Sequence, residues 1–171
     1  MTKKTIKTAA VILTAMLMMC GCSTKNDTKE DTSSAAINAE KAANITAEEL
    51  LADISGDNLD GRLSKGDGKY DANAAKFYGT GFANILDGAI LYNENGGYAD
   101  EVSAVKFDEG IDGQELLKER LESRTATFRD YRPEEVSKLE SAKIISLGDF
   151  DILIISDDAD TIEKQLKDKL P

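Results

Sequence analysis

The sequence contains no histidine and no tryptophan, and it has only two cysteines in 171 residues. Without histidine the chain cannot form a Ser-His-Asp triad, a Cys-His pair or an HExxH zinc site. Basic residues are also scarce, because 32 acids face 21 bases and give a formal net charge of −11. This acidity argues against nucleic-acid binding, for which a basic surface is expected. The length suits one ordinary domain.

The N-terminus carries the pattern of a secretory signal. Lys3, Lys4 and Lys7 precede an apolar run from Ala9 to Met19. This run is too short to cross a bilayer core, which needs about 20 helical residues. A positive start followed by a short apolar stretch is typical of a signal peptide.

The apolar run ends in Met19-Cys20-Gly21-Cys22, which resembles the bacterial lipobox. In that pattern a small residue directly precedes a cysteine whose thiol takes a diacylglyceryl group, and a signal peptidase cuts between the two. We therefore predict a lipoprotein signal peptide over residues 1–21 and a lipid on Cys22. Two alternatives stay open, which are an ordinary cleaved signal with incidental cysteines and a short uncleaved anchor.

Lipidation of Cys22 would leave the mature chain without a free thiol, which excludes a disulfide and a thiol nucleophile. The mature chain would carry 18 bases against 32 acids, a charge of −14 that anionic lipid head groups repel. Attachment is therefore expected from acyl chains such as palmitate, since two or more chains anchor stably. The predicted partner is the membrane, and the predicted location is its extracytoplasmic face in a bacterium of Gram-positive type.

Residues 22–44 are predicted to be the lipidated cysteine and a flexible tether. This segment is rich in small and polar residues, and Ile37 is its only large apolar one. It cannot bury enough surface to offset the entropy of ordering. As a coil it would span roughly 25 Å. The globular domain is predicted over residues 45–171.

The domain begins with a helix signal. Thr46 and Glu49 fit a capping box, Ile45 and Leu50 fit the accompanying hydrophobic staple, and Gly56 is expected to end the helix. Residues 55–75 follow as a predicted polar loop with four glycines and four aspartates. Calcium binding is the less favoured reading of this loop, because the EF-hand spacing is absent and basic residues are interleaved.

The remaining pattern predicts strands in adjacent pairs. Strands are expected at 89–92 and 102–107, with a hairpin formed by 143–147 and 150–156 around Gly148-Asp149. Helices are expected at 112–129, at 133–141 and at the C-terminus. Strand pairs without βαβ alternation predict an α+β fold. We expect a small antiparallel sheet of two strand pairs, including the C-terminal β-hairpin, packed with three to four helices.

Segment 76–87 has no clear assignment. Its aromatic residues Phe77, Tyr78 and Phe82 could line a ligand cleft, although core packing is the favoured role.

Several short motifs recur in one known family. They are Ala99-Asp100-Glu101 before a strand that carries Lys106, a long helix that carries Arg120, Tyr131-Arg-Pro133, and Gly148-Asp149-Phe150 leading to Ile154-Ile155-Ser156-Asp157. Over residues 45–170 the pattern resembles an uncharacterised family of small lipoproteins from Firmicutes, known only as a domain of unknown function. The resemblance implies a surface-anchored α+β domain and implies no activity.

Two adjacent acids are candidate binding residues. Asp100 and Glu101 precede a strand, and paired carboxylates can act as acid and base. Neighbouring strand residues point to opposite faces, however, so the two would not converge unaided. The favoured interpretation is a loop cap or a structural salt bridge, with Lys106, Arg120 or Arg124 as partner.

The other candidates lie near two predicted helices. Asp157, Asp158 and Asp160 could hold a divalent cation, but an N-cap with favourable dipole charges is favoured. Tyr131 could contact a ligand, while a half-buried anchor with its hydroxyl bonded to backbone is favoured.

These observations predict no catalytic residue, no metal ligand and no cofactor. The leading interpretation is a membrane-anchored, non-catalytic binding or interaction domain, whose ligand, partner and oligomeric state the sequence does not name. The alternative is a carboxylate-dependent hydrolase or a metal-dependent enzyme of the cell envelope.

Overall fold

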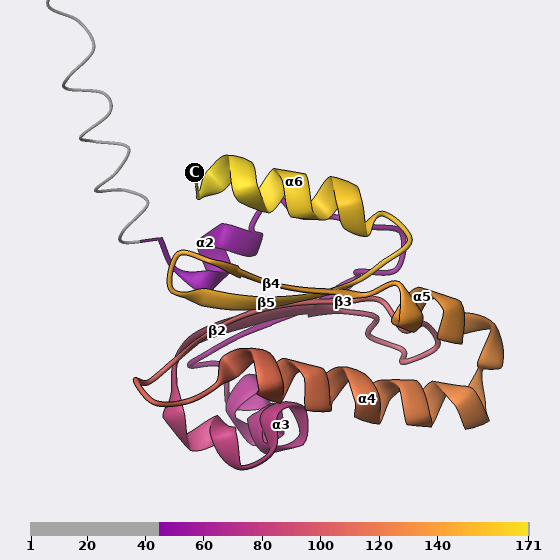
Figure 1. Ribbon diagram of the computed structural model, residues 1–171, viewed down its shortest axis with the longest axis horizontal. Helices are drawn as coiled ribbons and strands as arrows, with labels where there is room; N and C mark the ends of the chain where they lie inside the picture. Colours follow the sequence, from indigo (N-terminus) through magenta and orange to yellow (C-terminus); the bar gives the residue numbers. More distant parts are fainter. Residues whose placement is uncertain (1–44, 171) are drawn as a thin grey trace, which may run out of the picture.

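The computed structural model describes residues 45–170 (Figure 1). Its strands form one antiparallel sheet in the order β1-β2-β3-β5-β4. The strands are β1 Gly61–Ser64, β2 Ile85–Tyr92, β3 Glu101–Phe107, β4 Lys143–Leu147 and β5 Phe150–Ile155. The helices are α2 Ala47–Leu51, α3 Gly68–Tyr78, α4 Gly113–Tyr131, α5 Val136–Glu140 and α6 Ala159–Lys169, with short 3₁₀ helices at Gly79–Asn84 and Pro133–Glu135.

The sheet lies between two layers of helices. Helices α2 and α6 cover one face, and α3 and α4 cover the other (Figure 1). Strand β3 shows how the sequence builds both cores, because Val102 and Ala104 pack toward α2 and α6 whereas Val105 and Phe107 pack toward α3 and α4. Alternating side chains point to opposite faces of a strand. The predicted α+β class is confirmed.

The predicted loop over residues 55–75 is wrong. Strand β1 forms within it by pairing with β2, and α3 begins at Gly68. The buried side chains of α3 are Tyr70, Ala74 and Tyr78, which recur every four residues and so share one helical face. The unassigned segment 76–87 comprises the end of α3, a 3₁₀ helix and the start of β2.

The first helix starts as predicted and ends earlier. The Thr46 side chain accepts a hydrogen bond from the Glu49 backbone N–H, and the Glu49 carboxylate accepts one from the Thr46 N–H. The capping box is therefore confirmed. Helix α2 ends at Leu51, so the prediction that Gly56 ends it is wrong.

The C-terminal hairpin is confirmed. Leu147 pairs with Phe150, and the turn between them contains Gly148 at φ +56°, a conformation that glycine adopts without strain. Lys106 on β3 reaches the turn, with its Nζ 2.6 Å from the Asp149 carboxylate.

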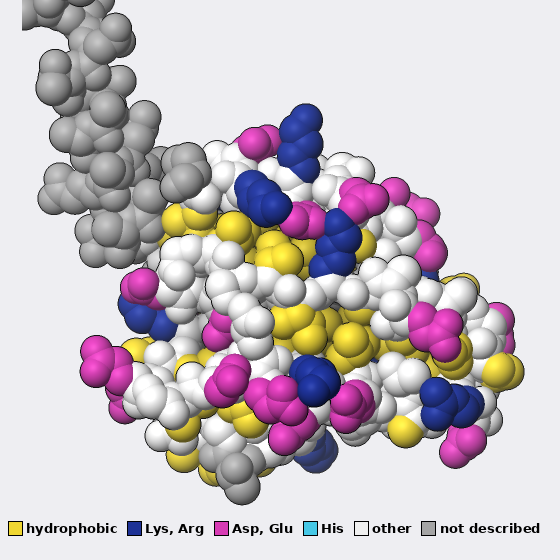
Figure 2. Space-filling view, in the orientation of Figure 1, with side chains coloured by type: hydrophobic (Ala, Val, Ile, Leu, Met, Phe, Trp, Pro, Cys, Tyr) yellow, Lys and Arg dark blue, Asp and Glu magenta, His cyan; other side chains and the backbone are white. Residues whose placement is uncertain are grey.

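Strand β4 is one edge of the sheet. Figure 2 shows acidic side chains across this face of the molecule and hydrophobic side chains gathered between α6 and α4, on either side of β4. Ile144, Ile145 and Leu147 are the partly buried residues of this strand. Lys143, the first residue of β4, forms ion pairs with Asp160 and Glu163 of α6. A charge at an edge strand opposes unwanted strand pairing.

The predicted signal peptide, the lipid on Cys22 and the predicted tether lie outside residues 45–170 and stay predictions. In the described part of the chain, no helix is long and apolar enough to cross a membrane.

Candidate functional site

Glu101 begins β3 and has no solvent exposure. Two α4 guanidinium groups hold it, with Arg120 Nη2 at 2.7 Å and Arg124 Nε at 3.3 Å from its carboxylate. The Ser103 hydroxyl, two residues along the strand, donates a third contact at 2.9 Å. Arg120 and Arg124 were both among the partners that the sequence predicted, so that part of the salt-bridge interpretation is confirmed, whereas Lys106 pairs with Asp149 instead. The bidentate Arg120 contact joins the sheet to α4.

The charge of Glu101 is fixed by these partners. Burial alone would raise the pKa of Glu101, but the attraction of Arg120 and Arg124 and the hydrogen bonds from Arg120 and Ser103 lower it to about 2. A carboxyl group that stays ionised above pH 2 has no proton to donate at neutral pH. Glu101 therefore joins sheet to helix and offers no acid to a substrate.

Asp100 points away from Glu101, as expected for adjacent residues near a strand. Its carboxylate lies 2.7 Å from Lys138 Nζ on α5, and that same ammonium lies 3.1 Å from Glu135. Burial alone would lower the pKa of Lys138, but hydrogen bonds to Asp100 and Glu135 raise it. Asp157 approaches Lys138 as well, at 3.3 Å, with its side chain 83% exposed. The structure thus brings Asp100 and Asp157 together on one lysine, and Lys138 and Glu135 are partners that the sequence analysis missed.

Tyr131 and Asp158 lie apart from this cluster of charges. Tyr131 is 65% exposed and packs edge-on against Phe128, so the prediction of a half-buried anchor is wrong. Asp158 is the N-cap residue of α6, but its carboxylate makes no capping hydrogen bond. Within residues 45–170, no group of three or more Asp, Glu, His or Cys side chains is placed to hold a metal ion.

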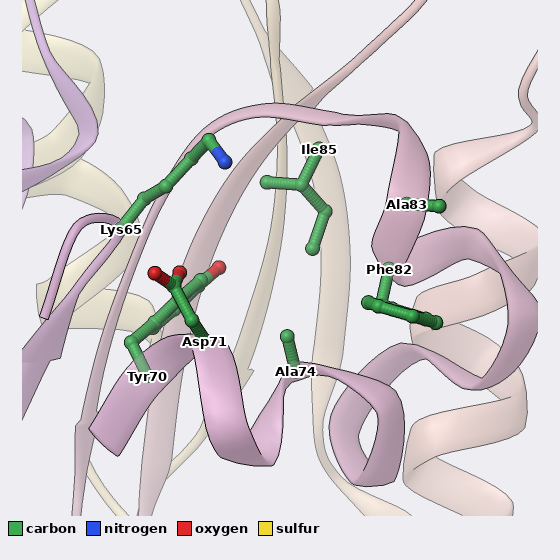
Figure 3. A pocket seen from close by; sticks show the side chains of 7 residues that line it. All are labelled: Lys65, Tyr70, Asp71, Ala74, Phe82, Ala83 and Ile85. Carbon is green, nitrogen blue, oxygen red and sulfur yellow. The ribbon is translucent and has the colours of Figure 1, made fainter. Parts of the chain in front are cut away.

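A pocket of about 250 Å³ opens on the α3 side of the sheet (Figure 3). We call it the α3 pocket. Figure 3 shows the polar ends of Lys65 and Asp71 on one side of the pocket and the apolar side chains of Phe82 and Ile85 on the other. The residues that line it are Lys65, Tyr70, Asp71, Ala74, Phe82, Ala83 and Ile85.

The charged groups of the α3 pocket have no ion-pair partner. Neither the Lys65 ammonium nor the Asp71 carboxylate forms an ion pair or a side-chain hydrogen bond with the described part of the chain, and they do not pair with each other. Lys65 and Asp71 are exposed, whereas Asp100 and Glu101 are buried and paired with cations. The pocket therefore places two exposed charges of opposite sign beside apolar surface.

Tyr70 is the buried polar residue of the α3 pocket. Its side chain is 1% exposed, and its hydroxyl has no hydrogen-bond partner among the described residues. Burial raises the pKa of Tyr70 to about 12, so the hydroxyl keeps its proton at neutral pH. The Tyr78 hydroxyl, which is also buried, lies beside it on the same face of α3.

Glycine at position 88 makes room for the Tyr70 ring. A Cβ atom at Gly88 on β2 would lie 2.1 Å from the Tyr70 hydroxyl oxygen, which is closer than any tolerated contact.

Of the aromatic residues predicted either to line a cleft or to pack in the core, the structure assigns both roles. Phe82 lines the α3 pocket and is 45% exposed. Tyr78 is buried, and Phe77 lies under the Arg120 guanidinium at 4.7 Å. The missed pocket residues had one signal in the sequence, the spacing of Tyr70, Ala74 and Tyr78, which the surrounding glycines and aspartates masked.

A family model for a domain of unknown function (DUF4358) matches residues 62–156, more than half of the chain. The chain belongs to the DUF4358 family. The predicted resemblance to a family known only as a domain of unknown function is confirmed. No curated protein and no solved structure matches the chain.

The DUF4358 match covers all five strands of the sheet except the first residue of β1. It begins within β1 and ends just after β5, so α2 and α6 lie outside it. The α3 pocket and the partners of Glu101 fall inside the matched range, while Asp157 and Asp158 fall outside it.

Proposed function

We propose that this DUF4358 protein is a lipid-anchored, non-catalytic binding domain on the extracytoplasmic face of the bacterial cell membrane. The signal-like N-terminus ending at Cys22 supports the anchor. The acidity of the chain supports attachment by acyl chains, because a negative domain gains nothing from anionic head groups.

The observation that carries the binding function is the α3 pocket. It combines apolar side chains with two charged groups that lack ion-pair partners in the described part of the chain. Small-molecule sites combine apolar side chains with a few polar groups that fix the orientation of the ligand, and the α3 pocket has apolar and polar surface in about equal share. Asp100 and Glu101, the paired acids that the sequence analysis considered for catalysis, are both buried in ion pairs and are not available to a substrate. This contrast favours binding over carboxylate catalysis.

Substitution of the two cysteines tests the anchor. With a radiolabelled fatty acid, Cys22→Ala is expected to lose the label and to accumulate as uncleaved precursor or to leave the membrane. The matched control is Cys20→Ala, which keeps the cysteine that follows Gly21 and should be labelled and processed like the native chain. Undiminished labelling of Cys22→Ala would contradict the proposed anchor.

A further inference from the structure

We infer that the α3 pocket binds a small zwitterion with an apolar side chain, a free α-amino acid of the leucine type. This inference rests on the proposed binding function and names its ligand class. It follows from two features of the pocket, which are its opposite charges and its apolar wall.

The first feature is a pair of opposite charges that do not neutralise each other. Lys65 and Asp71 line the same pocket, and neither forms an ion pair with the described part of the chain. A zwitterion can place its carboxylate at Lys65 and its ammonium at Asp71 at the same time. A ligand with only an anionic group would meet the Asp71 carboxylate unbalanced, and a ligand with only a cationic group would meet the Lys65 ammonium unbalanced.

The second feature is the apolar wall opposite these charges. Ala74 of α3, Phe82 of the 3₁₀ helix and Ile85 of β2 point into the pocket (Figure 3). Phe82 is 45% exposed, so a ligand side chain packed against its ring would remove apolar surface from water. The volume of about 250 Å³ equals the liquid volume of on the order of eight water molecules, which suits a single amino acid.

A titration with leucine and two analogues tests the ligand class. The full-length chain is purified from membranes in detergent and titrated by calorimetry with leucine, with isocaproate, which lacks the ammonium, and with isoamylamine, which lacks the carboxylate. Leucine is raised to about 10 mM, which detects a millimolar Kd. We expect leucine to bind at least about ten-fold more tightly than either analogue, the ratio for one lost charged hydrogen bond.

Variants then place the ligand in the α3 pocket. Lys65→Met and Asp71→Asn should each weaken leucine binding by about ten-fold. Two exposed residues outside the pocket serve as matched controls, Lys69→Met on the same helix and Asp130→Asn on α4, and both should leave the affinity unchanged.

Each other result overturns the inference. Equal affinity for leucine and an analogue would show a binding pocket without zwitterion selectivity, so the binding function would stand and the ligand class would fall. Leucine binding that Lys65→Met and Asp71→Asn leave intact would place the ligand elsewhere. No binding of any of the three would reject the pocket as this site. Fatty-acid labelling at Cys22 is independent of the titration, so a failed anchor and a failed ligand class are told apart.

Discussion

At the scale of single residues, Glu101 has no contact with solvent and still keeps its charge, because two guanidinium groups lie against it. Removing two charges from water is costly, and the attraction between them offsets that cost only while both partners are present. The side chains of Arg120 and Arg124 are 12% and 18% exposed, so they depend on the same carboxylate. The β3–α4 contact therefore depends strongly on the Glu101 carboxylate.

Replacing Glu101 with glutamine tests this dependence. Glu101→Gln keeps the side-chain shape and leaves two largely buried cations without an anion, so the free energy of unfolding should fall by roughly 3 to 5 kcal/mol. Urea denaturation measures the change. The matched control is Glu115→Gln, whose partner Lys118 and own side chain are more than half exposed, and it should cost less than about 1 kcal/mol. Equal losses in the two variants would refute a special role for Glu101.

The same carboxylate predicts how stability depends on pH. The pKa of Glu101 is lowered from its ordinary value of 4.5 to about 2 in the folded chain. Its contribution is therefore fully present above pH 4.5 and is lost as the pH falls toward 2. This loss amounts to roughly 3 kcal/mol. Urea denaturation of the native chain and of Glu101→Gln at several pH values should give a difference that shrinks below pH 4.5, and a constant difference would be inconsistent with this prediction.

At the scale of helices and strands, the sequence predicted the elements in which apolar residues are closely spaced. Strand β3 and the β4–β5 hairpin follow from alternating or continuous apolar residues and from the turn at Gly148. Helix α3 was missed because its buried face has only Tyr70, Ala74 and Tyr78, within a segment rich in glycine and aspartate. Strand β1 was missed because Leu63 is its one large buried side chain, and pairing with β2 supplies the rest.

The candidate site was less predictable than the strands. Arg120 could be named as a partner of Glu101 because α4 follows β3 directly in the chain. Lys138 could not be named for Asp100, since the two are 38 residues apart and meet only when α5 packs at the end of the sheet. The α3 pocket likewise exists only once α3, the 3₁₀ helix and β2 are assembled.

The packing of α3 on the sheet predicts the effect of adding a Cβ atom at position 88. Gly88→Ala would press its Cβ against the Tyr70 hydroxyl and should destabilise the fold by about 1 to 3 kcal/mol. Adding Tyr70→Phe to Gly88→Ala should recover part of that loss, because the closest atom is removed. Gly68→Ala is the control, since nothing lies near its added Cβ and alanine favours a helix. Thermal denaturation of the native chain and these three variants measures this, and a loss without any recovery in the double variant would argue against the contact.

At the scale of the whole molecule, the sheet is covered on both faces and the chain carries an excess of acid. Net negative charge keeps such a domain away from anionic lipid, so the proposed location depends on covalent lipid rather than on the surface of the fold. At the proposed location, the α3 pocket is the amphipathic site that we propose for molecules outside the membrane.

The most direct test of this account is the mass of the N-terminal peptide from protein extracted from membranes. The account predicts a mature chain that lacks residues 1–21 and begins with Cys22 carrying a diacylglyceryl group. A membrane fraction in which Cys22 is unmodified, or in which the chain begins at another residue, would contradict the claim that this protein is a lipid-anchored domain.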